Sequence, residues 1–113
     1  MKKEVDLKRI IDSICQFSQN LFAAKLDKII LYGSYARGDF DEESDIDVMV
    51  VVDMNEANLR HYEALFTEFS SKESLENEVL ILPLLCDKTR FEAQIKYVPF
   101  MQDVNTKGKV IYG

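Results

Sequence analysis

The sequence has 113 residues, of which 47% are hydrophobic and 30% charged, and its formal net charge is −6. A chain of this length is in the usual range of one domain, so we expect a single domain over residues 1–113 that has no separate substrate domain. The acidic balance argues against a protein that binds nucleic acid by neutralising its phosphates, which needs clustered Lys and Arg. No apolar run approaches the roughly 20 residues that cross a bilayer, and Met-Lys-Lys-Glu does not begin a signal peptide, so we expect a cytoplasmic protein without a membrane partner.

The first half of the chain predicts one long helix and two strands. Apolar residues recur at steps of three and four, which indicates an amphipathic helix from about Glu4 to Ala24. Two short apolar runs, KIILY at Lys28–Tyr32 and IDVMVVV at Ile46–Val52, indicate buried strands. In the second run, period-two alternation places Asp45, Asp47, Met49 and Val51 on one face of the strand and Ile46, Val48, Val50 and Val52 on the other.

The second half predicts helices around one further strand. Asp53 and Glu56 have the spacing of a capping box, and a helical stripe follows to about Phe69. The polar stretch 70–77 is interpreted as a connection. A strand is expected at about Val79–Leu85, where Pro83 removes a ladder donor and favours a sheet edge or a bulge.

The C-terminal residues carry recognisable helix boundaries. Asp87 can cap a helix over roughly Lys88–Tyr97, and Pro99 suits the first turn of a last helix that ends near Gly108. Residues 110–112 would form a terminal strand. The whole order indicates an α/β (α+β) fold in which helices cover a small mixed sheet.

The cysteines and the histidine give no sign of a metal site. Cys15 and Cys86 lie in apolar surroundings without metal-ligand spacing, so we interpret them as reduced core residues. His61 lies in a polar helical pattern and is expected at the surface.

Gly33 and Ser34 follow the first strand. Glycine permits a sharp turn and a close approach of a phosphate to the backbone. Ser34 can either cap the next helical turn or donate a hydrogen bond to a phosphate oxygen. Strand-to-helix turns often use these residues for structural reasons alone, so this pair by itself is weak evidence.

Asp45 and Asp47 follow the Gly-Ser pair after ten residues. Two carboxylates on one strand face repel each other unless a cation lies between them. Hard oxygen ligands suit Mg²⁺, which proteins commonly hold through one or two carboxylates and the phosphates of a substrate. The alternative is a polar strand end in solvent.

Together these residues resemble the minimal nucleotidyltransferase (MNT) family of the DNA polymerase β-like superfamily. The matching elements are Gly33-Ser34, Ala36-Arg37-Gly38, the ten-residue spacing and Ser44-Asp45-Ile46-Asp47. The resemblance implies that Gly33 and Ser34 contact the triphosphate of ATP and that Asp45 and Asp47 are catalytic ligands of two Mg²⁺ ions. Arg37 either supplies charge to the leaving pyrophosphate or is an exposed helix residue. Gly38 and Ser44 would shape the loop.

One element of the family pattern is not evident. Catalytic members usually bring a third carboxylate from a later strand, at the position that corresponds to Leu80. In this sequence that strand is EVLILPLL, Glu78 to Leu85, in which Glu78 is two residues before Leu80 and so shares its face. Its longer side chain would substitute as a catalytic carboxylate. The alternative is a solvated residue at the start of the strand.

The resemblance also implies a partner. Small members are often encoded beside a HEPN-domain ribonuclease toxin, which they neutralise as antitoxins by transferring AMP to a tyrosine. The sequence therefore predicts a protein adenylyltransferase that acts on a HEPN-type partner and leaves homo- and hetero-oligomers open. Two alternatives remain: a catalytically degenerate domain that neutralises a HEPN-like protein by occlusion, and a nucleotidyltransferase for small molecules such as antibiotics.

Overall fold

The structure is a computed structural model that describes residues 4–113. Its centre is a four-stranded sheet in the order β3-β2-β1-β4, in which β2 and β3 are parallel and the other neighbours antiparallel. The strands are β1 (Leu26–Tyr32), β2 (Ile46–Val52), β3 (Ile81–Asp87) and β4 (Lys109–Tyr112). The expected mixed sheet is confirmed, and β3, which contains Pro83, is an edge strand as the proline predicted.

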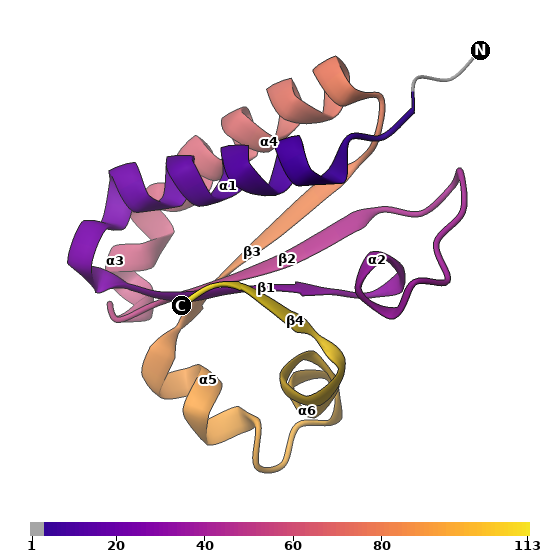
Figure 1. Ribbon diagram of the computed structural model, residues 1–113. Helices are drawn as coiled ribbons and strands as arrows, with labels where there is room; N and C mark the ends of the chain where they lie inside the picture. The colour runs from indigo at the N-terminus through magenta and orange to yellow at the C-terminus, as the bar shows by residue number, and fades with distance from the viewer. Residues whose placement is uncertain (1–3) are drawn as a thin grey trace.

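Helices cover both faces of this sheet (Figure 1). On one face lie α1 (Leu7–Phe22) and α4 (Glu63–Asn77), and on the other lie α5 (Lys88–Gln94) and α6 (Pro99–Lys107). The short helices are α2 (Ser34–Arg37) and α3 (Glu56–Leu59), with 3-10 turns η1 (Ala23–Lys25) and η2 (Arg60–Tyr62). Among residues 4–113, no helix is long and apolar enough to cross a bilayer. Met1 to Lys3, which entered the signal-peptide argument, lie outside the described residues.

The alternation predicted for β2 is confirmed by the way the core divides. One cluster buries the even-numbered residues Ile46, Val48, Val50 and Val52 against Ile10, Ile14 and Phe66 of α1 and α4. A second cluster buries Met49 and Val51 against Phe91, Met101 and Val104 of α5 and α6. Asp47 is therefore on the face that α5 and α6 cover, at the second residue of β2.

Two boundaries near α4 differ from the prediction. Residues 70–77 are helical because their polar side chains bond to the helix itself: the Asn77 amide donates to the carbonyl of Glu73 (2.8 Å), and the Ser70 hydroxyl donates to the carbonyl of Thr67 (3.2 Å). The Asp53–Glu56 capping box is also wrong. The N-cap of α3 is Asn55, whose side-chain oxygen accepts from the backbone N–H of Asn58 at 2.9 Å.

The C-terminal boundaries largely agree. Asp87 caps α5 by accepting from the N–H of Thr89 (2.8 Å), Pro99 opens α6, and Gly108 follows its last residue. Helix α5 is shorter than expected and ends at Gln94 instead of about Tyr97. Both cysteines are free thiols; Cys86 is buried and Cys15 half-buried, and His61 is exposed.

Candidate nucleotide and metal site

The turn after β1 requires glycine for two reasons. Gly33 has φ +76°, a left-handed conformation, and a Cβ atom built on it would lie 2.6 Å from Oδ2 of Asp47. Its carbonyl accepts from the N–H groups of Ala36 and Arg37, at 3.1 Å each, and so starts α2. Ser34 is the first residue of this helix and not its cap, which excludes the capping role considered for it. The turn thus lets the Asp47 carboxylate lie against its backbone.

A structured loop leads to the carboxylates. Gly38 ends α2 in the left-handed conformation (φ +85°). The Ser44 hydroxyl accepts from the N–H of Asp41 (2.9 Å) and donates to its carboxylate (3.3 Å), while the Ser44 N–H donates to the Asp41 carbonyl (3.2 Å). Gly38 and Ser44 therefore shape the loop, and Asp45 is set immediately before β2.

The pKa values of Asp47 and of its neighbour Tyr32 are both raised. Burial and then the nearby Asp45 carboxylate raise the pKa of Asp47, and the Arg37 guanidinium opposes this shift. Tyr32 is paired with Asp47 across β1 and β2, and burial together with the Asp47 charge raises the pKa of its phenol to about 12. Two carboxylates this close form a donor set that fits Mg²⁺, because that ion needs only one or two of them besides substrate phosphates.

A cavity of about 440 Å³ opens at this turn. Gly33, Arg37 and Asp47 line it from one side, and Phe100 and Lys107 of α6 line it from another. Both cations have carboxylate neighbours: Arg37 lies 3.2 Å from Asp39 and Lys107 lies 3.5 Å from Asp103. The cavity, which Tyr32 and Asp103 also line, therefore offers two cations, two aromatic rings and two carboxylates to a ligand.

Sequence reasoning missed the contribution of α6. Phe100 and Lys107 are far from Gly33 along the chain, and no characteristic sequence spacing links them to the Gly-Ser and Asp-x-Asp motif. They reach the site because α6 packs against β1, with the rings of Phe100 and Tyr32 in an edge-to-face contact at 5.6 Å. The only local signal was Lys107-Gly108 directly before the terminal strand.

The strand-face argument for Glu78 is wrong. Strand β3 begins at Ile81, whereas Glu78 ends α4 in a left-handed conformation (φ 53°) and so has no strand face to share with Leu80. Glu78 does line a hollow together with Asp45. Within residues 4–113, however, no three His, Cys, Asp or Glu side chains are placed to hold one metal ion. The residue of β3 that pairs with Asp47 of β2 is Leu82.

Comparisons with known proteins agree with the resemblance seen in the sequence. A family profile described as nucleotidyltransferase domain matches residues 7–109. The Methanocaldococcus jannaschii protein named "Putative protein adenylyltransferase MJ0141" is 40% identical over 83 residues, which are 71% of this chain and 82% of that protein. The expected fold and the nucleotidyltransferase assignment are thereby confirmed.

Two solved structures share the fold. A chain of a toxin–antitoxin complex with AMP-PNP has a TM-score of 0.58 and 22% identity, covering 91% of this chain and 73% of that one. A chain of the tri-AMPylated Shewanella oneidensis HEPN toxin in complex with its MNT antitoxin has a TM-score of 0.50 and 19% identity, covering 93% and 71%. At these identities the likeness concerns the fold alone.

Proposed function

We propose a specific reaction for this chain, which belongs to the nucleotidyltransferase domain family: it transfers AMP from Mg·ATP to a tyrosine hydroxyl of a HEPN-type partner protein, as an antitoxin. Asp45 and Asp47 are the catalytic metal ligands in this proposal. Gly33, Ser34 and Arg37 hold the triphosphate, and the two Asp residues accommodate two Mg²⁺ ions.

The observation that carries the proposal is the approach of the Asp47 carboxylate to the Gly33 turn, within 2.6 Å of where a Cβ would be. A triphosphate held at this turn would therefore lie beside the Asp47 carboxylate, in a cavity that Arg37 and Lys107 also line. This geometry supports the proposal, because nucleotidyl transfer requires anion-binding groups and metal-binding groups beside each other.

Each residue has a definite chemical task. Gly33 leaves room for a phosphate at the backbone, Ser34 can donate a hydroxyl hydrogen bond to it, and Arg37 can neutralise the pyrophosphate as it leaves. Tyr32, with its pKa near 12, stays protonated at neutral pH and can donate a hydrogen bond. Bound Mg²⁺ would neutralise the triphosphate and lower the pKa of the attacking hydroxyl. In the overall reaction the acceptor oxygen bonds to the α-phosphorus, and the bond to pyrophosphate breaks.

The choice of a protein acceptor is supported by the relatives. The M. jannaschii protein is named a protein adenylyltransferase, and one solved complex joins an MNT antitoxin to an AMPylated HEPN toxin. A free tyrosine has a pKa near 10, so its oxygen is a poor nucleophile at neutral pH until the site helps to remove the proton. The Asp45–Asp47 pair meets that need by holding the cation.

The test is co-expression with the protein encoded beside this chain, followed by intact mass and peptide mapping. We expect AMP on a partner tyrosine with the wild type and none with Asp45→Asn/Asp47→Asn. Calorimetry should show Mg·ATP affinity lost in the same variant, while stability without ligand stays equal or rises because like-charge repulsion is relieved. Mg·ATP affinity unchanged in this variant would rule out the metal-site assignment.

A second function is favoured by one observation, the leucines beside the carboxylates. If the missing third carboxylate makes the domain inactive, it would neutralise its partner by occlusion alone. Turnover of Leu80→Asp decides between the two, with Leu65→Asp, an exposed leucine on α4, as the control for added charge. Activity that appears only in Leu80→Asp would identify the natural chain as a degenerate enzyme, and full activity in Glu78→Gln would remove Glu78 from the mechanism.

A further inference from the structure

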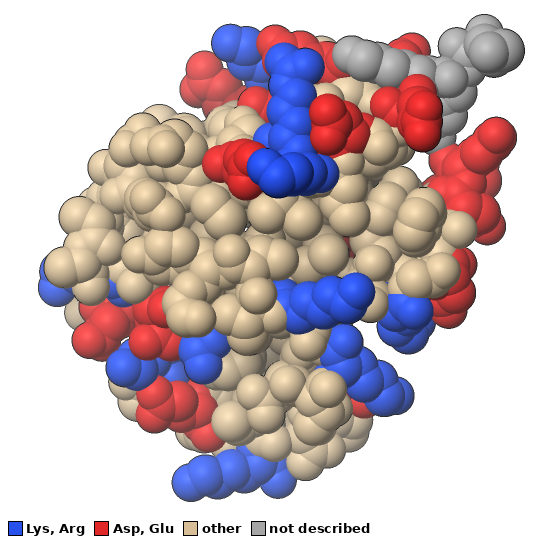
Figure 2. All heavy atoms as spheres, in the orientation of Figure 1, with Lys and Arg blue, Asp and Glu red and all other residues tan. Residues whose placement is uncertain are grey.

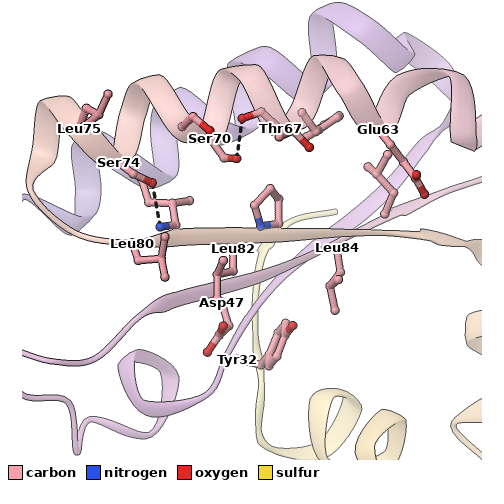
Figure 3. A pocket seen from close by; sticks show the side chains of 15 residues that line it. Tyr32, Asp47, Glu63, Thr67, Ser70, Ser74, Leu75, Leu80, Leu82 and Leu84 are labelled. Atoms are coloured by element: carbon pink, nitrogen blue, oxygen red, sulfur yellow. Dashed lines mark hydrogen bonds between the residues drawn. The ribbon is translucent and has the colours of Figure 1, made fainter.

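Strand β3 and the residue directly before it expose a row of leucines beside the carboxylate site. Leu80, Leu82 and Leu84 are 51%, 40% and 46% exposed. Figure 3 shows all three pointing away from α4, toward the side of the sheet where Asp47 and Tyr32 lie. In the parallel register of β2 and β3, Leu82 is the partner of Asp47 and Leu84 the partner of Met49. We call these three residues the leucine row.

The row is exposed because the covering helices end before it. Further along the same strand face, Cys86 is 9% exposed and packs with Phe91 of α5 and Met101 of α6. Leu84, two residues earlier, is outside that cluster. The leucine row therefore lies on the same sheet face as this core cluster but is exposed to solvent. A hollow of about 900 Å³ runs along β3 beside the row. Contiguous exposed apolar side chains of this kind mark interaction sites.

The outer edge of β3 is poorly suited to strand addition. The N–H of Ile81 donates to the Ser74 hydroxyl at 3.0 Å, as the dashed line in Figure 3 shows. Two residues on, at the position with the same orientation, Pro83 has no N–H. A partner strand would find neither donor, which disfavours strand addition at this end of β3 and favours contact through the side chains of the row.

The margin of the row is acidic. Glu63 lines the hollow along β3, and Glu42, Glu43, Asp45 and Glu78 line the adjoining hollow. No described Lys or Arg lines either of them. On the face shown in Figure 2, in contrast, Lys and Arg are spread among Asp and Glu. A second copy of this chain would bring the same acidic margin, and repulsion would oppose self-docking.

We propose that the leucine row is the docking surface for the protein acceptor, and that the acceptor contributes apolar side chains flanked by lysine or arginine. The inference rests on the proposed function. Neighbouring strands lie about 4.8 Å apart, so a side chain seated on Leu82 is one strand from Asp47. Docking here brings an acceptor hydroxyl to the carboxylates without any contact to the strand edge.

The experiment uses three short fluorescent peptides that each carry one tyrosine. The first has leucines flanked by lysines, the second has the same leucines flanked by glutamates, and the third has serines in place of the leucines. We expect the first to bind about tenfold more tightly than the others by fluorescence anisotropy, because only it offers both apolar contact and opposite charge. Equal binding of all three would overturn the proposal.

Variants locate the contact. Leu82→Gln/Leu84→Gln should remove the preference for the first peptide, whereas Leu65→Gln, equally exposed at 44% on α4, should keep it. Loss of the preference in Leu65→Gln alone would place the docking surface elsewhere. Sedimentation supplies a further check: a wild-type dimer that the double variant dissociates would mean that a second copy covers the row, which also overturns the proposal.

Two measurements separate this inference from the proposed function. Mg·ATP affinity should be the same in the wild type and in Leu82→Gln/Leu84→Gln; an equal loss of nucleotide and peptide binding would assign the row to the nucleotide and overturn docking. Selective peptide binding without any Mg·ATP binding by the wild type would instead support the docking surface while refuting the proposed transfer reaction.

Discussion

Replacing Gly33 by alanine tests whether the Gly-Ser turn exists to admit the Asp47 carboxylate. The new Cβ would lie 2.6 Å from Oδ2 of Asp47, closer than real contacts allow, on a backbone with φ +76°. Gly38 provides a control for a positive φ without a clash, because it has φ +85° and no atom within 4 Å of its Cβ position. Both substitutions meet a positive φ, but Gly33 (ψ −156°) lies outside the αL region that Gly38 (ψ 7°) occupies. Gly33→Ala therefore adds a larger backbone cost as well as the clash.

The size of each effect follows from this geometry. A left-handed alanine costs about 1–2 kcal/mol, and overpacking adds about 1–3 kcal/mol where the neighbour cannot move. Gly38→Ala should therefore lower the free energy of unfolding by about 1–2 kcal/mol. Gly33→Ala, whose backbone lies outside the αL region, should lower it by up to about 6 kcal/mol. If the Asp47 carboxylate rotates away instead, stability is spared but the metal ligand is displaced. Mg·ATP affinity should then fall about 10- to 100-fold, as when support of a metal ligand is disturbed.

Urea unfolding and calorimetry with Mg·ATP measure the two quantities for Gly33→Ala, Gly38→Ala, Asp47→Ala and the Gly33→Ala/Asp47→Ala pair. Removing the carboxylate should reduce the stability cost of Gly33→Ala by about 1–3 kcal/mol, which is the coupling energy expected when the carboxylate stays in place. The reasoning fails if Gly33→Ala has the same stability and the same Mg·ATP affinity as Gly38→Ala.

Three further outcomes are expected. Burial raises the pKa of Cys86 from 9.0 to about 11, so the thiol ionises at a lower pH in the unfolded chain than in the folded one. The free energy of unfolding should therefore fall from pH 9 to pH 11, and Cys86→Ala should reduce this slope. Iodoacetamide should also modify this thiol slowly at pH 8. Asp87→Ala should cost about 1 kcal/mol in urea unfolding through loss of the α5 cap. Removing Mg²⁺ with EDTA should abolish ATP binding in calorimetry, since the acidic pair then repels the nucleotide.

Local patterns were sufficient wherever one short segment decides the structure. The alternation of Ile46–Val52 fixed which face of β2 carries Asp47, and Asp87 and Pro99 marked helix starts correctly. The polar stretch 70–77 misled because Ser70 and Asn77 satisfy their hydrogen bonds within the helix, which composition does not reveal. That longer helix moved the start of β3 and took Glu78 off the strand.

The site itself divides in the same way. Gly33, Asp45 and Asp47 lie within the continuous segment from β1 through α2 to β2, so their motif could be recognised from the sequence. Phe100 and Lys107 arrive through packing of α6 on β1, a long-range contact that no spacing encodes. The exposed leucines on β3 were also hidden, because their exposure depends on where α5 and α6 stop.

The charge arrangement around the cavity explains how an acidic domain can favour an anionic nucleotide only under set conditions. Its two cations do not present full positive charge, because Arg37 lies 3.2 Å from Asp39 and Lys107 lies 3.5 Å from Asp103. Both pairs are exposed and therefore weak, so a triphosphate can take over the cations at little cost. Asp45 and Asp47 still repel it until a divalent cation reverses the sign of their field. In the proposed reaction, affinity for the nucleotide would thus be conditional on the metal that the chemistry also needs.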